Sequence, residues 1–362
     1  MRLSRNKIKV VQQSLSLSVL GGTTSEFKAL QHSSLGEAFE FIPMVLTDYK
    51  RGINIHDILF YYRFLKCHTY DIVHIRGAGP DCLNCVIAAK LAGKGKILVT
   101  IHGLYSDLIY ISPLKKWFSK NIVERLNLAL ADGISCVCEA AEKRPYFEKY
   151  RHKMLPYVYN RIPEFQIEQQ PMMRDKIRKQ YHISDKDTVA LFMGRVTREK
   201  GLEVLLEALK TLDGSVYEHF TLLIAGDGDY LPQLKAECGA LTNKIIFTGF
   251  VGNTEEFYAA ADFFLLPTLH ENHSISLLEA AAAGLPAICT DCGGNAEIVK
   301  NGVTGVLVPV FDSEKLKNAI LQMLDIDFRA DLKKNLQHDN FSKFSNAAVD
   351  EKLSGVYRLL LK

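Results

Sequence analysis

Two glutamates separated by seven residues flank a predicted helix start in the second half of the chain. Glu271 lies in a polar loop, and Glu279 lies inside the apolar run Ile275–Ala283, which is predicted to form a helix that ends at Gly284. A loop that leads into a helix presents unpaired backbone N–H groups and a partial positive charge, so it favours a phosphate group. The pattern therefore predicts an anion site with a carboxylate on each side. An alternative for Glu279 needs no ligand, because Ser276 and Glu279 have the spacing of a capping box.

A second group of charged residues follows the predicted strand 188–193. Gly194 and Arg195 stand at its carboxyl end, and Lys200 precedes a predicted helix. That helix has a core-facing stripe of leucines, Leu202, Leu205, Leu206 and Leu209. Arginine can bind phosphate bidentately and lysine adds a point charge, so two cations beside a helix start suit a diphosphate. The alternative is a solvated charged turn, since residues 198–200 form an ordinary charge run.

Together these motifs resemble the donor site of the retaining GT-B glycosyltransferases of family 4. The resemblance is dense from about residue 177 to residue 309, and it includes the runs Ala-Ala-Gly-Leu-Pro and Gly-Gly-Asn-Ala-Glu-Ile-Val after the second glutamate. It implies that Glu271 is a catalytic residue beside the donor sugar and that Glu279 hydrogen-bonds the nucleotide ribose. It also implies that Arg195 and Lys200 bind the nucleotide diphosphate.

The loop after the first glutamate departs from the family pattern, which commonly has small residues there. Asn272, His273 and Ser274 stand in that place. We expect the backbone N–H groups of Ser274 and Ile275 to reach a donor phosphate, and the side chain of Asn272 or His273 to narrow the sugar pocket. The resemblance also places the segment Phe250–Val251 beside the nucleotide base, largely through backbone contacts.

Two sites in the first half complete the expected donor site. The pair Gly21 and Gly22 precedes residues 23–26, which are predicted as the first turn of a helix, and glycine lets the backbone approach a phosphate closely. A plain glycine turn is the alternative. His102 ends the predicted strand 96–102, and the resemblance implies a catalytic role there, orienting a hydroxyl or stabilising positive charge. The alternative is a structural histidine.

The order of apolar segments predicts an α/β protein. Parallel strands with crossover helices are expected from six segments in each half, 7–12, 39–46, 71–76, 96–102, 133–138 and 154–159, then 188–193, 220–225, 244–248, 263–266, 287–290 and 306–309. The polar stretch 160–175 reads as a linker. We therefore predict the GT-B fold, with two Rossmann-like doubly wound domains, residues 1–162 and 163–345, facing a central cleft. Residues 346–362 are predicted to form a helix that crosses back to the first domain.

Charge is distributed unequally along the 362 residues. Residues 1–160 contain 22 lysines and arginines against 13 aspartates and glutamates, a net charge of +9, and the remainder carries −6. A basic nucleic-acid module would show tighter clusters and a recognisable motif, so nucleic acid is not an expected partner. Anionic lipid head groups or an acidic acceptor fit better. The aromatic and basic stretch 109–130, which contains the only tryptophan, indicates peripheral membrane contact, and an ordinary surface helix with snorkelling lysines is the alternative.

Metal binding is not expected. The pairs Cys82/Cys85 and Cys289/Cys292 would have to converge across some two hundred residues to form a zinc site. His270 and His273 flank Glu271 but lack the i,i+4 spacing that places two ligands on one helical face. Reduced thiols in a cytoplasmic protein explain the cysteines.

The resemblance implies transfer of a sugar from a nucleoside diphosphate sugar, with retention, to a hydroxyl of a glycan or lipid-linked acceptor. We expect a UDP-sugar donor in preference to a GDP-sugar, no cofactor, and a role in surface polysaccharide biosynthesis at the inner face of the plasma membrane. The alternatives are a non-catalytic nucleotide-sugar-binding protein of GT-B fold, or another GT-B enzyme such as a sugar-nucleotide epimerase or a phosphorylase.

Overall fold

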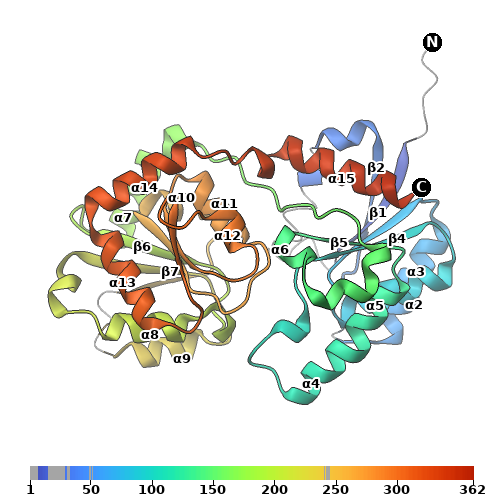
Figure 1. Ribbon diagram of the computed structural model, residues 1–362, viewed down its shortest axis with the longest axis horizontal. Coiled ribbons are helices and arrows are strands. Elements are labelled where there is room, and N and C mark those ends of the chain that lie inside the picture. The colour runs from blue at the N-terminus through green and yellow to red at the C-terminus, as the bar shows by residue number, and fades with distance from the viewer. Residues whose placement is uncertain are drawn as a thin grey trace, which may run out of the picture. The chain divides into compact units, whose positions relative to one another are not determined.

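The computed structural model describes residues 7–14, 29–30, 33–48, 50, 52–239, 241 and 245–362. The predicted phosphate turn Gly21-Gly22 lies outside these residues. The chain divides into two compact units (Figure 1). Unit 1 comprises Met1–Arg161 and Ser342–Lys362, and unit 2 comprises Ile162–Phe341. These bounds lie within a few residues of the domain limits expected from the sequence.

Unit 1 is built on a parallel sheet with the strand order β2-β1-β3-β4-β5. Its strands are β1 (Ile8–Ser14), β2 (Phe39–Val45), β3 (Ile72–Arg76), β4 (Lys96–Ile101) and β5 (Gly133–Cys136). Its helices are α2 (Ile55–Cys67), α3 (Pro80–Ala92), α4 (Pro113–Phe118), α5 (Glu124–Leu130), α6 (Glu139–Glu142) and α15 (Asn346–Leu360). A π-helical turn, η3 (Ser119–Val123), joins α4 to α5. The order of the strands reverses between β1 and β3.

Unit 2 repeats the plan with a six-stranded parallel sheet in the order β11-β10-β9-β6-β7-β8. Its strands are β6 (Thr188–Met193), β7 (Phe220–Ala225), β8 (Ile245–Gly249), β9 (Phe263–Leu266), β10 (Ala287–Thr290) and β11 (Gly305–Val308). Its helices are α7 (Gln170–Gln180), α8 (Leu202–Lys210), α9 (Leu231–Cys238), α10 (Thr254–Ala260), α11 (Ile275–Ala282), α12 (Asn295–Ile298), α13 (Ser313–Leu324) and α14 (Ile326–His338). The strand order reverses between β6 and β9.

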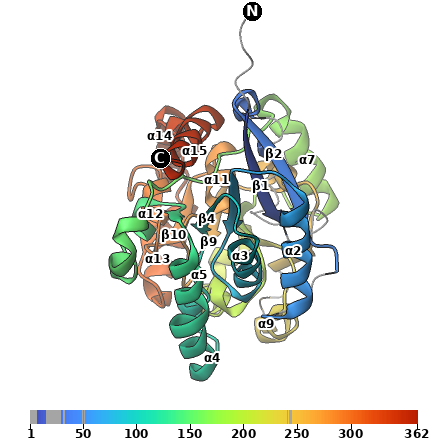
Figure 2. The same cartoon turned by 90° about the vertical axis from the view of Figure 1, so that its right-hand side faces the viewer.

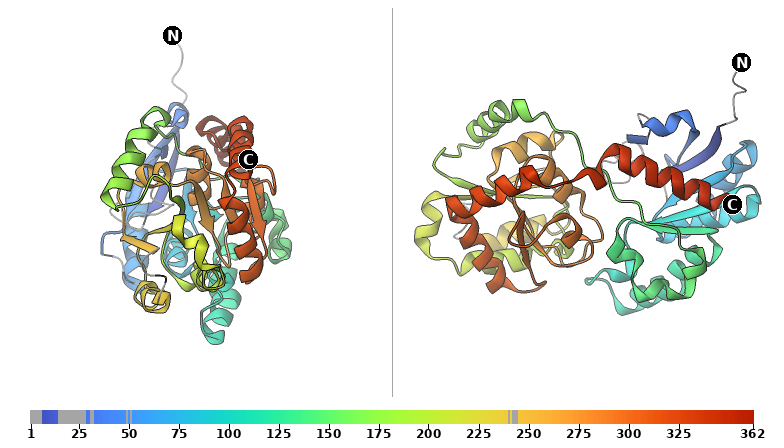
Figure 3. Two further views of the ribbon diagram at one scale, coloured as in Figure 1. Left: turned by 90° about the vertical axis from the view of Figure 1, so that its left-hand side faces the viewer. Right: turned by 45° about the horizontal axis from the view of Figure 1, so that its top comes forward.

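Both central sheets are buried, as parallel sheets are when helices cover their two faces. Every residue of β7, β9 and β10 is buried, and the leucine stripe predicted on α8 faces the core. Seen from the side, helices lie on both faces of the sheet of unit 2 (Figure 3). The two doubly wound α/β units confirm the predicted fold class.

Two predicted segments are wrong. Residues 154–159 do not form a strand: Met154 makes an isolated bridge to Ile134 beside β5. Pro156 lies in the middle of this segment and has no N–H to donate to a ladder. The supposed linker 160–175 ends early, because α7 begins at Gln170 with a proline in its first turn, where the missing N–H costs no hydrogen bond.

The last helix, α15, packs on the sheet of unit 1. Its predicted apolar positions, Val349, Leu353, Val356 and Leu360, are all buried. The hydroxyl of Tyr357 lies 2.8 Å from Nδ1 of His74 on β3 and accepts a hydrogen bond of 2.9 Å from Gln12 on β1. Near the other end, Asp350 forms a buried ion pair of 2.6 Å with Arg161. The C-terminal segment is therefore part of the first unit.

Across the part of the chain that the structure describes, no helix is both long and apolar enough to span a bilayer.

Candidate active site

The predicted donor residues lie where the strand order of unit 2 reverses. Arg195 and Lys200 follow the carboxyl end of β6, and Glu271 follows the carboxyl end of β9, the neighbouring strand. In doubly wound sheets the crossover helices leave in opposite directions at this point, which opens a crevice at the carboxyl ends of the two strands. The topology of unit 2 therefore places residues from distant parts of the sequence at one end of its sheet.

The two loops at this point are locked together by backbone contacts. The N–H group of Leu269 donates to the carbonyl oxygen of Glu199 over 2.9 Å. Gly201 has a φ of 67°, and a Cβ atom there would lie 1.8 Å from the carbonyl oxygen of Pro267. Only glycine permits both the left-handed conformation and this close approach. The contact brings the loop that contains Lys200 against the loop that leads to Glu271.

The result is a direct ion pair between two of the predicted site residues. Nζ of Lys200 lies 2.7 Å from Oε2 of Glu271, although the residues are 71 positions apart. Both side chains are about one-fifth exposed, at 20% and 19%. An ammonium group has three N–H donors, so this contact leaves Lys200 able to bind a ligand oxygen while it orients the carboxylate.

A glycine turn packs against the backbone of Glu271. Gly293 has a φ of 55°, and a Cβ atom at this position would lie 1.7 Å from the carbonyl oxygen of Glu271. The next residue, Gly294, donates its N–H to the carbonyl oxygen of Asn272 over 2.6 Å. The Gly-Gly run that follows β10 is thus required for packing against the loop, whatever ligand the loop binds.

The start of α11 differs from the capping-box alternative. The N-cap is Ser274, whose Oγ accepts from the N–H of Leu277 over 3.3 Å. Ser276 therefore lies inside the helix, and its spacing from Glu279 is not a capping box. Ser274 is buried, as are Asn272 and His273, which departed from the family pattern.

Glu279 is held from within unit 2 by Tyr258 on α10. The Tyr258 hydroxyl donates to Oε2 of Glu279 over 2.9 Å and lies 3.1 Å from the carbonyl oxygen of Ser276. Burial raises the pKa of Glu279 to about 7, and the Tyr258 hydrogen bond opposes that rise. A buried carboxylate with one donor can accept further hydrogen bonds. The two hydroxyl groups of a ribose could donate them.

Arg195 is available at the same end of the sheet. It is exposed, and its guanidinium group has no hydrogen bond or ion pair to any residue that the structure describes. Arg198, by contrast, pairs with Glu203 and lies over the ring of Tyr230. The two arginines of this loop therefore differ, because the Arg198 side chain is bound to other side chains of the protein and the Arg195 side chain can bind a ligand.

The predicted base-binding segment follows β8. Phe250 is 64% exposed, and Val251 is partly buried. The turns at the ends of β6, β7 and β8 are tied together, since Gly226 donates to the carbonyl oxygen of Gly249 and Gly194 donates to that of Ala225. Among the residues that the structure describes, no hydrogen bond or ion pair joins the segment to Lys200 or Glu271, so its role stays a prediction.

His102 is placed in unit 1, directly after β4. Burial, followed by the positive charge of Arg76, lowers the pKa of His102 to about 3. The imidazole is therefore neutral near pH 7, which suits it to orient a hydroxyl and not to act as a cation.

Comparisons with known proteins show the family to which the chain belongs. Residues 173–339 match the model of the family described as Glycosyl transferases group 1, and residues 25–144 match that of Glycosyltransferase Family 4. An uncharacterised glycosyltransferase of Methanocaldococcus jannaschii is 31% identical over 319 residues, covering 82% of this chain and 77% of the relative. The chain belongs to glycosyltransferase family 4.

Other relatives of this glycosyltransferase carry more specific names. A UDP-Gal:alpha-D-GlcNAc-diphosphoundecaprenol alpha-1,3-galactosyltransferase of Escherichia coli is 24% identical over 327 residues, covering 88% of this chain and 82% of the relative. An Anabaena protein crystallised with UDP and glucose has the same fold, with a TM-score of 0.75 and 18% identity over 96% of this chain and 98% of that one. The GT-B fold predicted from the sequence is therefore confirmed.

Some contributors to the site of this glycosyltransferase could not be found from its sequence. Tyr258 has the ordinary appearance of a core aromatic on a helix, and nothing in its spacing connects it to Glu279. The contact between Gly293 and Glu271 was equally hidden, although the Gly-Gly pair itself was visible. Among the described residues, no group of three or more His, Cys, Asp or Glu side chains could hold a metal ion.

Proposed function

We propose that this glycosyltransferase moves a sugar from a UDP-sugar to a hydroxyl of a glycan or lipid-linked acceptor, with retention at the anomeric carbon. The observation that carries the proposal is the ion pair between Lys200 and Glu271 at the point where the strand order reverses. It joins a cation suited to a diphosphate with a carboxylate suited to a sugar. The E. coli relative named above uses a UDP-sugar and a lipid-linked acceptor, and this supports the choice of donor and acceptor.

The difficult step in such a transfer is departure of the charged diphosphate. Arg195 and Lys200 would stabilise the negative charge that develops on the leaving oxygen, and the N–H groups at the start of α11 would add to this effect. The ion pair with Glu271 holds Lys200 in place before the reaction, and loop contacts hold the start of α11, so these donors need little reorganisation. Glu271 would position the sugar, and Glu279 would accept hydrogen bonds from the ribose. His102 would orient a hydroxyl as a neutral imidazole.

The test is a panel of UDP- and GDP-sugars in which nucleotide release is measured with and without glycan and lipid-linked acceptors. We expect acceptor-dependent release of UDP from a UDP-sugar. Glu271→Ala should abolish transfer and leave UDP affinity undiminished, because Lys200 then loses its carboxylate partner and is free for the diphosphate. A fully active Glu271→Ala variant would remove this residue from the site.

Arg195 offers a matched comparison with Arg198 in the same loop. Arg195→Ala should weaken UDP binding about tenfold, as expected for loss of one charge-assisted phosphate contact. Arg198→Ala should have little effect, since its guanidinium group is already committed to Glu203 and Tyr230. Equal effects of the two substitutions would contradict the assigned diphosphate role.

We further propose that transfer needs no divalent metal, because Arg195 and Lys200 supply the positive charge that a metal would otherwise provide. Activity should survive EDTA treatment without loss. Activity that disappears with EDTA and returns with Mg²⁺ or Mn²⁺ would contradict this.

The acceptor proposal includes contact with an anionic membrane through a surface of unit 1, α4 to α5. Figure 2 shows α4 at the lower edge of this unit, away from α2 and α3. Its exposed apolar side chains are Leu114, Trp117, Phe118, Ile122 and Leu126. Lys115, Lys116, Lys120 and Arg125 lie among them. An interfacial helix requires both kinds of group. Its apolar side chains insert into the membrane interface, and its basic side chains bind anionic head groups.

The membrane proposal is tested by co-sedimentation with phosphatidylglycerol vesicles. Leu114→Glu with Trp117→Glu should abolish sedimentation with the vesicles. Leu91→Glu is the matched control, because Leu91 on α3 is also exposed, at 63%, but lies outside this surface. Binding that is equal for phosphatidylglycerol and phosphatidylcholine vesicles, or insensitive to the double substitution, would contradict the proposal.

A further inference from the structure

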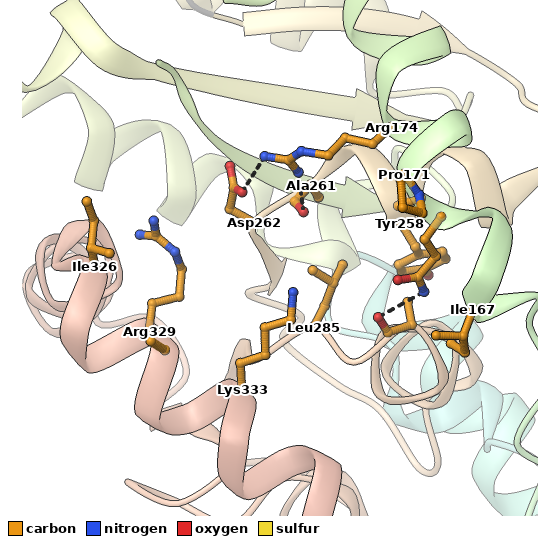
Figure 4. Close-up of a pocket in the computed structure, with 14 residues that line it drawn as sticks. Ile167, Pro171, Arg174, Tyr258, Ala261, Asp262, Leu285, Ile326, Arg329 and Lys333 are labelled. Carbon is orange, nitrogen blue, oxygen red and sulfur yellow. Dashed lines mark hydrogen bonds and ion pairs between the residues drawn. The ribbon is translucent and has the colours of Figure 1, made fainter. Parts of the chain in front are cut away.

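A cavity lies within unit 2, at the end of the sheet opposite to Lys200 and Glu271. Its volume is about 470 Å³. It is bounded by α7, α10, α14 and the segment after α11 (Figure 4). Asp262, which lines it, directly precedes β9, whereas Glu271 follows that strand. The cavity is therefore separate from the donor site described above.

Positive charge dominates the wall of this cavity. Arg174, Arg329 and Lys333 line it, against the single carboxylate of Asp262. Figure 4 shows Arg329 and Lys333 extending from α14 toward the opposite wall, which carries Arg174 and Asp262. Three cations facing one carboxylate leave an excess of positive charge inside a concave site, which favours an anionic ligand.

The carboxylate of Asp262 makes its hydrogen bonds with groups other than the cations of α14. Its Oδ1 accepts from Arg174 over 2.8 Å, and its Oδ2 accepts from Arg178 over 2.8 Å and from the N–H of Val189 over 2.7 Å. Asp262 is thus occupied by two arginines of α7 and a strand N–H.

Arg329 and Lys333 therefore have no ion pair with any residue that the structure describes. Within the described part of the chain, neither forms an ion pair, and Arg329 only donates one N–H to the carbonyl oxygen of Met323. Partial burial lowers the pKa of Arg329; the nearby carboxylate of Asp262 opposes this shift, and the like charge of Arg174 adds to it. An anion bound between these groups would offset the free-energy cost of burying their positive charge, since charge-assisted hydrogen bonds to guanidinium and ammonium groups are strong.

The rest of the wall suggests the size and nature of the ligand. Ile167, Pro171, Leu285 and Ile326 provide apolar surface beside the cations. A volume of about 470 Å³ is more than a lone phosphate needs and falls in the range of small-molecule sites. A phosphate group on a small carbon skeleton would use both parts of the wall.

Tyr258 connects this cavity to the donor site. Its side chain lines the cavity, and its hydroxyl is the group that donates to Glu279 over 2.9 Å. The cavity also contacts Ala283 at the end of α11, the helix whose first residues border the donor loop. A ligand that restrains Tyr258 and the end of α11 would hold Glu279 in place before the nucleotide arrives.

We propose that this cavity binds a phosphorylated metabolite of sugar-phosphate size through Arg174, Arg329 and Lys333, and that its occupation tightens nucleotide binding at the donor site through Tyr258. The second half of this statement rests on the proposed function, whereas the first does not. The two halves are therefore tested by different measurements.

Binding is measured by ³¹P NMR line broadening of inorganic phosphate and, separately, of ribose 5-phosphate. We expect the wild type to broaden both signals, with ribose 5-phosphate bound at least as tightly as phosphate. Arg329→Ala with Lys333→Ala should weaken binding tenfold or more. Lys333→Glu alone, at an exposed position that should not disturb folding, should weaken it severalfold.

Two matched variants locate the bound phosphate. Lys334→Ala, on the same helix but outside the cavity, should leave broadening unchanged, and so should Arg195→Ala, which weakens binding at the donor site instead. Loss of broadening in Arg195→Ala, or unchanged broadening in both the double variant and Lys333→Glu, would overturn the proposal. Exclusion of ribose 5-phosphate while phosphate binds would overturn the assigned ligand size.

Coupling is measured by calorimetric titration of UDP with and without saturating ribose 5-phosphate. We expect UDP affinity to rise about threefold or more in the wild type and to be unaffected in Tyr258→Phe, which keeps the ring but lacks the hydroxyl. An unchanged UDP affinity in the wild type would overturn the coupling. A protein that binds no UDP at all would refute the proposed function, and the NMR result would still decide whether the cavity binds phosphate.

Discussion

The carboxyl group of Glu279 should make the free energy of unfolding of unit 2 depend on pH. The substitution Glu279→Gln should remove this dependence. Burial raises the pKa of Glu279 from 4.5 to about 7 in the folded protein. A carboxyl group whose folded pKa is raised stabilises the protein at low pH, and this stabilisation is lost as pH rises through the folded value. Between pH 5 and pH 8, wild type should therefore lose about 2 to 3 kcal/mol relative to Glu279→Gln, from 1.36 kcal/mol per pKa unit.

The assay is the melting temperature of both proteins between pH 5 and pH 8, without nucleotide. For a unit of about 180 residues, 1 kcal/mol corresponds to roughly 2–4 °C, so the difference between the two proteins should change by roughly 5–10 °C across this range. Glu207→Gln, on the exposed face of α8, controls for the exchange of a carboxyl for an amide. A wild-type minus Glu279→Gln difference that stays constant with pH would refute the reasoning.

Three further substitutions test other contacts. Gly293→Ala should destabilise unit 2 by about 2 kcal/mol or more, because its Cβ would lie 1.7 Å from the carbonyl oxygen of Glu271 and its φ is 55°; an unchanged melting temperature would contradict this. Asp350→Ala should cost about 3 kcal/mol by leaving Arg161 buried without its partner, as read from thermal unfolding of unit 1. Lys200→Ala should weaken UDP binding about tenfold in calorimetry, and retained affinity would show that its only role is to hold Glu271.

Local sequence rules predicted most of the strands and the ends of several helices. Segments 188–193, 220–225, 263–266 and 287–290 form strands with the predicted bounds. Continuous apolar runs of this length are typical of buried parallel strands, and their turns are marked by glycine. The helix stop at Gly284 is also local, since its φ of 70° is what a C-terminal glycine provides.

Local rules failed where features of one segment favoured different structures. Residues 154–159 are apolar enough for a strand, but Pro156 removes a ladder donor and the segment pairs only at isolated points beside β5. The capping-box alternative for Glu279 was wrong because Ser276 lies inside α11, whereas the predicted helix start at Ile275 is correct. Ser274 caps the helix, and the N–H group of Gly294 holds the preceding loop by donating to the carbonyl oxygen of Asn272.

The sequence by itself determined the types of residue that can bind a diphosphate and a sugar, and the order of strands and helices that carries them. It could not determine which of these residues touch, because contacts between positions 71 residues apart depend on how the strands are ordered in the sheet. The pairing of Lys200 with Glu271 exists because β6 and β9 are neighbours, and the support of Glu279 by Tyr258 exists because α10 packs beside α11. The cationic cavity likewise draws on helices far apart in the sequence, and only their packing brings Arg329 and Lys333 of α14 to face Arg174 of α7.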